Sequence, residues 1–365
     1  MPEPRAGYKP LLVFINPCSG TGIAKKLYRK HLLPNLNQLE VPHEVITTDH
    51  AGHASETVRH ENFDPNSYCG IVTISGDGLM FEVLNGMYKR WPDDWQERLG
   101  KIPIGLVPGG SGNALNCSIL RQLNQPLDGI NNLGAKHSAD NVANGAKNNQ
   151  TTNLDFIEVE THDGHKLLSF LGVTIGLVAD VDLGSEFARI LGWIRVYFLV
   201  AYRILFPRAY LCKVSYLPLP LDSDGKPVPV TAADSPITMP GIDKPVPDNW
   251  VTQTGRYFIV YAINIPLLDP MTLLSPDSRT NDGVIWLVMV RDSMPRKEML
   301  QWLMNAGEAG HVGKTGVELV PVRAFRIDPI RPRGYLSIDA ESFKFGMVQG
   351  QILPSKAKIL SSTPS

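Results

Sequence analysis

The stretch from Gly70 to Gly86, GIVTISGDGLMFEVLNG, sets a single aspartate, Asp77, between two glycines. The residues before it predict a strand and those from about Leu79 predict a helix, so Asp77 is expected at the carboxyl end of a strand. A carboxylate there can accept the proton of a hydroxyl group that attacks a phosphoryl group. It can also cap the following helix. The residue types alone leave both roles open.

Two further glycine-rich stretches follow strand-like runs nearby. They are NPCSGTG at 16–22 and PGGSGN at 108–113, and with SGDG at 75–78 they account for three of the first four strand-to-helix loops. Glycines let the backbone approach a ligand, and a helix after such a loop presents unpaired N–H groups to an anion. Because the carboxyl ends of parallel strands meet at one sheet edge, we expect a phosphate-binding crevice.

Strand and helix patterns alternate over the first 120 residues, which indicates a parallel sheet covered by helices on both faces. The strands are expected at 11–16, 43–48, 69–75 and 102–107, and the helices at about 22–39, 54–60, 79–89 and 113–120. Residues 134–150 are polar and rich in glycine and asparagine, so we interpret them as a surface loop or interdomain connection. The sequence therefore predicts an α/β nucleotide-binding domain with a parallel sheet over residues 8–150.

Residues 151–358 contain many short strand-like runs separated by Pro, Gly and Asp turns. This pattern predicts an antiparallel β-sandwich as the second domain. Helical patterns interrupt it at 185–206 and 295–307. In the proline-rich segment 217–249, Ser235 precedes a proline, and it is either a site of proline-directed phosphorylation or an ordinary turn serine.

The composition excludes several classes of function. The formal net charge is −1, so no chain-wide basic field exists to hold a nucleic-acid backbone. The four cysteines form no C-x-x-C pair and no signal peptide opens the chain, which favours a cytoplasmic location. The longest apolar run, 196–202, is far shorter than the about 20 residues of a spanning helix. We expect no nucleic-acid partner and no transmembrane segment.

Other nucleotide-binding motifs fit less well. The first glycine loop has Lys25 where a dinucleotide fingerprint needs a third glycine or alanine. EAGHVGKT at 308–315 has a glutamate in place of the first P-loop glycine and follows a helical pattern. The sequence also lacks the H-R-D and D-F-G motifs of protein kinases.

SGDGLMFEVLNG, followed about thirty residues later by VPGGSGNAL, resembles the catalytic domain shared by diacylglycerol and sphingosine kinases. GLVADVDLGSEFARILGWIR at 176–195 is similar to sphingosine kinases in particular, and VPVRAFRI with IDAE extends the resemblance over nearly the whole chain. It implies a lipid kinase that uses ATP and Mg²⁺ to phosphorylate the primary hydroxyl of a sphingoid base, with a β-sandwich lipid-binding domain. A diacylglycerol or ceramide kinase, the related NAD kinases and a non-catalytic nucleotide or lipid sensor remain as alternatives.

The resemblance also assigns roles to residues. Asp77 matches the general base, and no residue is assigned as a direct metal ligand. Residues that match the substrate-binding positions are Ser75, Gly76, Asp77, Gly78 and Asp182. Residues that match the nucleotide-binding positions are Asn16, Pro17, Cys18, Thr48, Asp49, His50, Ala51, Gly52, Glu82, Gly110, Ser111, Gly112, Arg189, Arg195, Asp339, Ala340 and Glu341.

Asp182 matches the acid that holds the protonated amine of a sphingoid base. A carboxylate there would select that cation over a neutral lipid, and a turn or cap role is the alternative. The first glycine loop lacks the basic residues usual in the family, and His50 stands where an arginine is common. We therefore expect weaker ATP binding, with phosphate contacts from backbone N–H groups and from Lys25 or Lys26.

Apolar residues recur at helical spacing in WIRVYFLVAYRILF, residues 193–206, with arginines nearby. This face is either a core helix or a surface that docks on a membrane. With a lipid substrate implied, we expect reversible peripheral membrane association. The sequence leaves open whether two copies form a homodimer.

Overall fold

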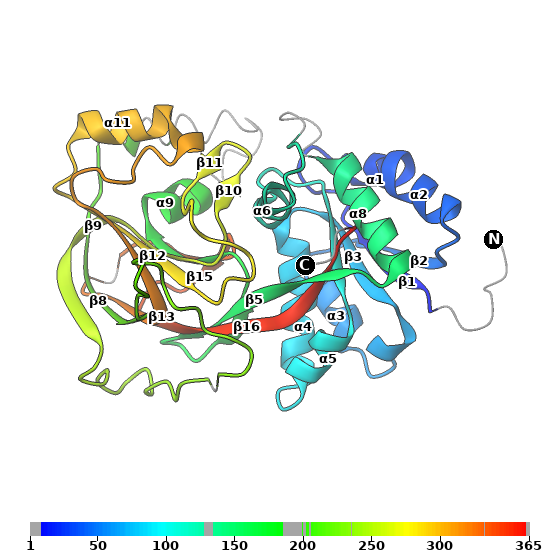
Figure 1. Ribbon diagram of the computed structural model, residues 1–365, viewed down its shortest axis with the longest axis horizontal. Coiled ribbons are helices and arrows are strands. Elements are labelled where there is room, and N and C mark those ends of the chain that lie inside the picture. Colours follow the sequence, from blue (N-terminus) through cyan, green and yellow to red (C-terminus); the bar gives the residue numbers. More distant parts are fainter. Residues whose placement is uncertain are drawn as a thin grey trace. The chain divides into compact units, whose positions relative to one another are not determined.

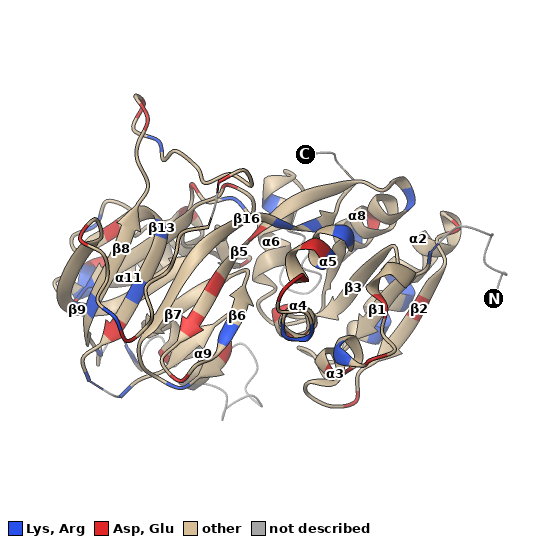
Figure 2. Cartoon of the chain, turned by 90° about the horizontal axis from the view of Figure 1, so that it is seen from below, with Lys and Arg blue, Asp and Glu red and all other residues tan. Residues whose placement is uncertain are grey.

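The computed structural model describes residues 9–127, 134–184, 199, 202–203, 206–234, 236–331 and 333–362. The chain divides into two compact units, one of residues 1–154 and 355–365 and the other of residues 155–354. The last strand, β16 (Val348–Leu360), therefore begins in the second unit and ends in the first. Acidic and basic residues are interspersed in both units, as Figure 2 shows.

The first unit contains a parallel sheet in the order β4-β3-β1-β2. Its strands are β1 (Leu11–Ile15), β2 (His43–Thr47), β3 (Gly70–Ser75) and β4 (Ile104–Pro108). Every residue of β1, β3 and β4 is buried, as expected for strands covered on both faces. The carboxyl ends of all four strands lie at the same edge, so the loops that follow them share that edge.

Helices cover this sheet (Figure 1). They are α1 (Ala24–Leu27), the π-helical turn η1 (Tyr28–Leu32), α2 (Leu33–Gln38), α3 (His53–Arg59), the 3₁₀ turn η2 (Pro65–Ser67), α4 (Asp77–Arg90), α5 (Trp95–Lys101), α6 (Ala114–Gln122) and α8 (Ala135–Asn148). Residues of α1, η1, α2 and α8 share one core cluster with the sheet. The four helices predicted over the first 120 residues are confirmed.

The prediction of a loop at 134–150 is wrong, because α8 occupies most of that segment. Its buried face consists largely of small residues, among them Ala135, Ser138, Ala139 and Ala143. These residues recur at helical spacing, but alanine and serine give little apolar contrast against asparagine and glycine. The helix therefore resembled a polar loop in sequence, although its small side chains let it pack closely on the sheet.

The second unit is built from antiparallel strands. The elements of this part of the chain are β5 (Thr151–Thr161), β6 (Lys166–Ser169), β7 (Gly172–Gly176), β8 (Tyr210–Pro218), β9 (Val251–Ile263), β10 (Leu267–Asp269), β11 (Thr272–Leu273), β12 (Ile285–Arg291), β13 (Val317–Pro329), β14 (Leu336–Ile338) and β15 (Glu341–Phe343), followed by β16. The long strands β9 and β13 each pair with three neighbours. This pattern fits strands that pass between the two layers of a sandwich. The predicted fold class is confirmed.

Three shorter elements accompany these strands, namely α9 (Leu177–Gly184), α11 (Arg296–Met304) and the 3₁₀ turn η4 (Ala306–Glu308). The helix predicted at 295–307 is confirmed by α11. Asp180 lies in α9. Most of the helix predicted at 185–206, and also Ser235, lie outside the described residues. In the described part of the chain, no helix has the length and apolar character needed to cross a membrane.

Candidate functional site at the glycine loops

The three glycine-rich loops of the first unit contact one another closely. A side chain on Gly20, whose φ is +55°, would place its Cβ atom 2.6 Å from the Gly109 carbonyl oxygen. A Cβ atom on Gly110 would lie 2.4 Å from the Cα atom of Gly76. Since such separations are shorter than any van der Waals contact, the loops require glycine where their backbones meet.

Ser19 joins the first loop to the second through its side chain. Its Oγ atom accepts a hydrogen bond from the Gly76 N–H at 2.9 Å and one from the Ser75 hydroxyl at 3.1 Å. Within the first loop, Asn16 Oδ1 accepts the Cys18 N–H at 2.9 Å, while Pro17 is half-buried and Cys18 is exposed. The sequence did not predict this bridging role of Ser19.

Asp77 is the first residue of α4, and its carboxylate points to a different helix. Its Oδ2 atom accepts the N–H of Ala114 at 2.8 Å and its Oδ1 atom accepts the N–H of Leu115 at 3.3 Å. These are the first two residues of α6. Asp77 therefore caps the helix after the third loop.

Burial sets the charge state of this carboxyl group. Desolvation raises the pKa of Asp77 to about 6, although the hydrogen bonds from Ala114 and Leu115 favour the ionised form. The residue is nevertheless only partly buried by surface area. Asp77 is thus a carboxylate that changes protonation near neutral pH and keeps some access to solvent.

The third loop is held by Asn113, which has a left-handed backbone with φ of +56°. Its side-chain amide accepts the Gly110 N–H at 2.9 Å and donates to the Gly110 carbonyl at 2.8 Å. Ser111 is exposed and Gly112 is half-buried. Asn113 was missed as a site residue, although an asparagine between a glycine loop and a helix is a recognisable left-handed or capping position.

Glu82 lies on α4, five residues after Asp77. Its Oε2 atom is buried and has no hydrogen-bond partner among the described residues. A buried, unpaired carboxylate oxygen is costly, and a hydrated cation or a ligand hydroxyl group would satisfy it. The residues present therefore fit a nucleotide with its magnesium ion.

The loop after β2 carries the predicted second nucleotide contact. Thr48 is buried and its N–H donates to the Ile15 carbonyl at 2.9 Å. Asp49, His50 and Ala51 are exposed. Gly52 has φ of +89°, which favours glycine, and α3 begins at the next residue.

His50 lies between two carboxylates in that loop. Hydrogen bonds to Glu56 and Asp49 raise its pKa, and the bond from His50 lowers the pKa of Asp49.

An open depression beside the first loop is lined by Gly22, Lys25, Lys26, Arg29 and Lys30. The lysines proposed to replace the missing loop cations therefore lie directly beside the loop.

The remaining predicted residues belong to the second unit. Asp339 is buried, and its carboxylate accepts the Ser169 hydroxyl at 2.6 Å and the N–H groups of Phe170, Leu171 and Gly172 at 2.9 to 3.0 Å. Asp339 and Ala340 form a tight turn between β14 and β15, with φ of +53° and +65°. The exposed Glu341 begins β15.

Asp182 lies in α9, but its side chain is outside the described residues, as are Arg189 and Arg195. The neighbouring Asp180 is buried; it accepts a hydrogen bond from the Tyr210 hydroxyl and pairs with Arg203 at 3.3 Å. Burial raises the pKa of Asp180. Its carboxylate is thus engaged within the second unit.

Solved structures share this fold. A diacylglycerol kinase structure from Bacillus anthracis superposes with a TM-score of 0.59 at 13% sequence identity, covering 98% of both chains. A second structure from the same organism gives a TM-score of 0.66 at 15% identity, covering 99% of this chain and 98% of the other. At these identities the likeness shows the fold alone.

The sequence relatives identify the family more specifically than the solved structures do. Residues 10–159 match the diacylglycerol kinase catalytic domain. The chain is 30% identical to sphingosine kinase 1 of Mus musculus, over 94% of this chain and 89% of that protein, and equally identical, over the same shares, to sphingosine kinase 1 of Homo sapiens. It is 28% identical to sphingoid long chain base kinase 4 of Schizosaccharomyces pombe, over 96% of this chain and 74% of that protein. The chain belongs to the sphingosine kinase family.

Proposed function

We propose that this protein transfers the γ-phosphoryl group of ATP to the primary hydroxyl of sphingosine or a related sphingoid base, giving sphingosine 1-phosphate. One observation carries the proposal: a partly accessible carboxylate, Asp77, lies where three glycine loops meet at the edge of a parallel sheet. Membership in the sphingosine kinase family supports the choice of substrate.

Asp77 is the proposed general base. A base works best when its pKa lies near the working pH, and the pKa of Asp77 is raised to about 6. The two N–H groups of α6 fix the direction of the carboxylate and leave lone pairs on both oxygens for the lipid hydroxyl. Ser75, Gly76 and Gly78, beside Asp77 in the second loop, are proposed to contact the same substrate.

The nucleotide is proposed to bind along the other two loops and the loop after β2. The proposed contacts are Asn16, Pro17, Cys18, Thr48, Asp49, His50, Ala51, Gly52, Glu82, Gly110, Ser111 and Gly112. Backbone N–H groups suit phosphate oxygens, and Lys25 and Lys26 lie close enough to the first loop to add positive charge. Mg²⁺ would supply positive charge to the phosphate groups of ATP. Glu82, whose buried Oε2 atom has no hydrogen-bond partner among the described residues, would help to hold the hydrated ion.

The second unit is proposed to supply the remaining contacts. Arg189, Arg195 and the turn Asp339–Glu341 are proposed to reach the nucleotide, the turn through its backbone and Glu341, because the Asp339 carboxylate is bound to residues 169–172. Asp182 is proposed to contact the amine of the lipid. Residues 193–206 are proposed to dock reversibly on a membrane, because the lipid substrate resides in bilayers. A cytoplasmic location and a homodimer belong to the same set of proposals.

The test is a side-by-side phosphorylation assay. Purified full-length protein is incubated with radiolabelled ATP, Mg²⁺ and one acceptor at a time, namely sphingosine, ceramide, diacylglycerol or NAD. We expect label on sphingosine. Preferential label on ceramide or diacylglycerol would contradict the substrate, and label on NAD would indicate the related nucleotide kinases. Nucleotide binding with no label on any acceptor would favour a non-catalytic sensor.

Asp182→Asn tests the basis of lipid selection. We expect a higher KM for sphingosine with an unchanged KM for ATP, because the amide cannot pair with the ammonium group as a carboxylate does. Asp180→Asn is the matched control for structural damage, since Asp180 is engaged with Tyr210 and Arg203. Undiminished sphingosine phosphorylation by Asp182→Asn would remove Asp182 from the site.

A further inference from the structure

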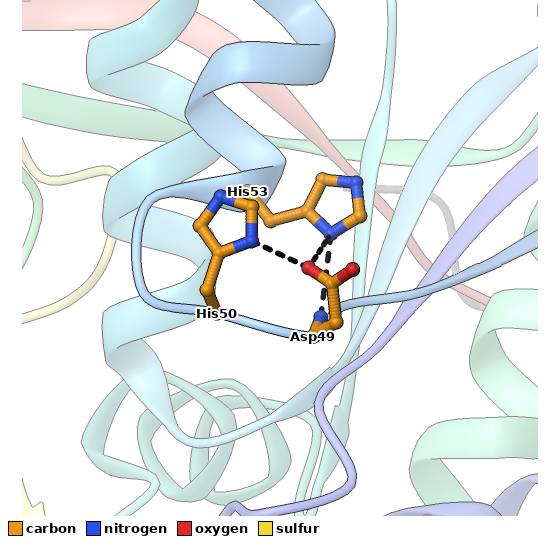
Figure 3. Close-up of side chains that lie close together, drawn as sticks. All are labelled: Asp49, His50 and His53. Carbon is orange, nitrogen blue, oxygen red and sulfur yellow. Dashed lines mark hydrogen bonds and ion pairs between the residues drawn. The ribbon is translucent and has the colours of Figure 1, made fainter.

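Two histidines and an aspartate converge in the loop between β2 and α3 (Figure 3). His50 Nδ1 lies 2.5 Å and His53 Nδ1 lies 2.9 Å from the same oxygen, Oδ1 of Asp49. One potential ligand atom from each of the three residues lies within 4.8 Å of the other two. Three ligand atoms of the types that transition metals prefer therefore lie close together.

The backbone holds these donors within five consecutive residues, Asp49 to His53. Gly52 takes a left-handed conformation, with φ of +89°, and turns the chain so that His53 opens α3. The imidazole rings of His50 and His53 stack with centroids 4.9 Å apart and planes within 5°. Stacking limits the rotation of both rings and keeps their Nδ1 atoms on the same side.

Glu56 adds a second, independent feature. Its Oε2 atom lies 2.9 Å from Nε2 of His50, on the ring edge away from Asp49. A carboxylate in that position holds a proton on Nε2, so Nδ1, which here bonds Asp49, is the nitrogen that can exchange its proton for a metal ion. Metal-binding histidines commonly have such a carboxylate partner on the nitrogen that does not bind the metal.

We propose that Asp49, His50 and His53 bind a divalent transition-metal ion such as Zn²⁺ or Co²⁺, with Glu56 as a positioning residue behind His50. The ligand atoms are Oδ1 of Asp49 and Nδ1 of each histidine, and water completes the coordination. Imidazole favours Zn²⁺ and Co²⁺ over Mg²⁺, which prefers oxygen ligands. This site is therefore distinct in chemistry from the magnesium ion that accompanies ATP.

Binding requires only a small movement. Tetrahedral Zn²⁺ with bonds of about 2.0 to 2.1 Å holds its ligands about 3.3 Å apart. The Asp49 oxygen must therefore withdraw by less than about 1 Å, and ligand atoms that now lie up to 4.8 Å apart must approach one another by up to about 1.5 Å. The Asp49 side chain is 75% exposed and the His50 side chain 51% exposed. The carboxylate is free to move, and an ion can enter from solvent.

The test uses full-length protein without nucleotide, so its result does not depend on the proposed kinase activity. Zn²⁺ binding is measured by titration calorimetry, and Co²⁺ binding by the visible absorption of the bound ion. The variants are Asp49→Asn, His53→Asn and Glu56→Gln. His60→Asn is the matched control, because His60 is an exposed histidine at the other end of α3 and lies outside the cluster.

We expect one equivalent of Zn²⁺ to bind to the wild-type protein and excess Mg²⁺ not to displace it. Asp49→Asn and His53→Asn should weaken binding at least about tenfold, Glu56→Gln by about tenfold, and His60→Asn should have no effect. No binding by the wild-type protein would overturn the proposal. So would binding that survives His53→Asn, is lost in His60→Asn, or yields to Mg²⁺.

Discussion

Asp77 and Asp339 are both buried enough that desolvation raises the pKa of each to about 6, yet they lie in very different surroundings. Asp339 is 1% exposed and receives four hydrogen bonds from residues 169–172. Asp77 receives two and is only partly buried by surface area. Both carboxyl groups therefore have a raised pKa. Asp77 is available for chemistry because it has fewer hydrogen-bond donors and more accessible surface, whereas Asp339 is held within the fold.

Asp77→Asn should have the largest effect on activity. The amide cannot accept a proton from the lipid hydroxyl, so kcat is expected to fall by about 10² to 10⁴-fold while the Kd for ATP changes little. Single-turnover kinetics with sphingosine would measure the loss. Asp282→Asn is the control, since Asp282 is another aspartate with a raised pKa and lies in the second unit. A variant at position 77 that retains full turnover would refute the assignment of the base.

Asp339→Ala should instead act on stability. It leaves the Ser169 hydroxyl and three N–H groups without their acceptor, and we expect a loss of about 3 to 5 kcal/mol in the free energy of unfolding. Asp339→Asn should lose less, because three of the four donors bond to a single oxygen that the amide can replace. Urea unfolding of both variants measures the difference. A rise in KM for ATP without lost stability would favour the predicted nucleotide contact over this structural role.

A third aspartate with a raised pKa links stability to pH. Burial, with Asp155 nearby, raises the pKa of Asp282 to about 7. A carboxyl group whose folded pKa lies above its unfolded value stabilises the fold at low pH, and that contribution is lost as pH rises through the folded pKa. Relative to Asp282→Asn, the wild-type protein should therefore lose about 2 to 4 kcal/mol between pH 4 and pH 8. Parallel unfolding free energies for the two proteins across that range would contradict this.

The contrast between the two aspartates also shows how far sequence could lead. Continuous apolar runs predicted the strands of the first unit correctly, and glycine spacing identified the loops that meet at the sheet edge. The partners of Asp77 could not be found this way, because Ala114 lies 37 residues away and contributes only a backbone N–H group. Ser19 was missed for the same reason, because its role depends on how closely the loop backbones approach.

Local sequence patterns did not predict the correct secondary structure where tertiary packing decides it. Helix α8 was predicted as a loop because its buried face consists of small residues in a polar segment, and α9 was not predicted as a helix. Asp339 was placed in the nucleotide site by resemblance, and no feature of IDAE indicated that residues 169–172, distant in the sequence, enclose its side chain. Burial of polar groups is thus the property that sequence conveys least.

The smallest expected effect lies one residue beyond Asp339. Ala340 has φ of +65° in a two-residue turn, where glycine is favoured. Ala340→Gly should raise the free energy of unfolding by about 0.5 to 1 kcal/mol, because relief of the left-handed alanine exceeds the added chain entropy of glycine. Ala233→Gly, at an exposed position with ordinary φ, should show no gain in the same urea titration. If Ala340→Gly destabilises the protein, the left-handed turn is not under strain. The hydrogen bonds of Asp339 alone would then fix the position of its carboxylate.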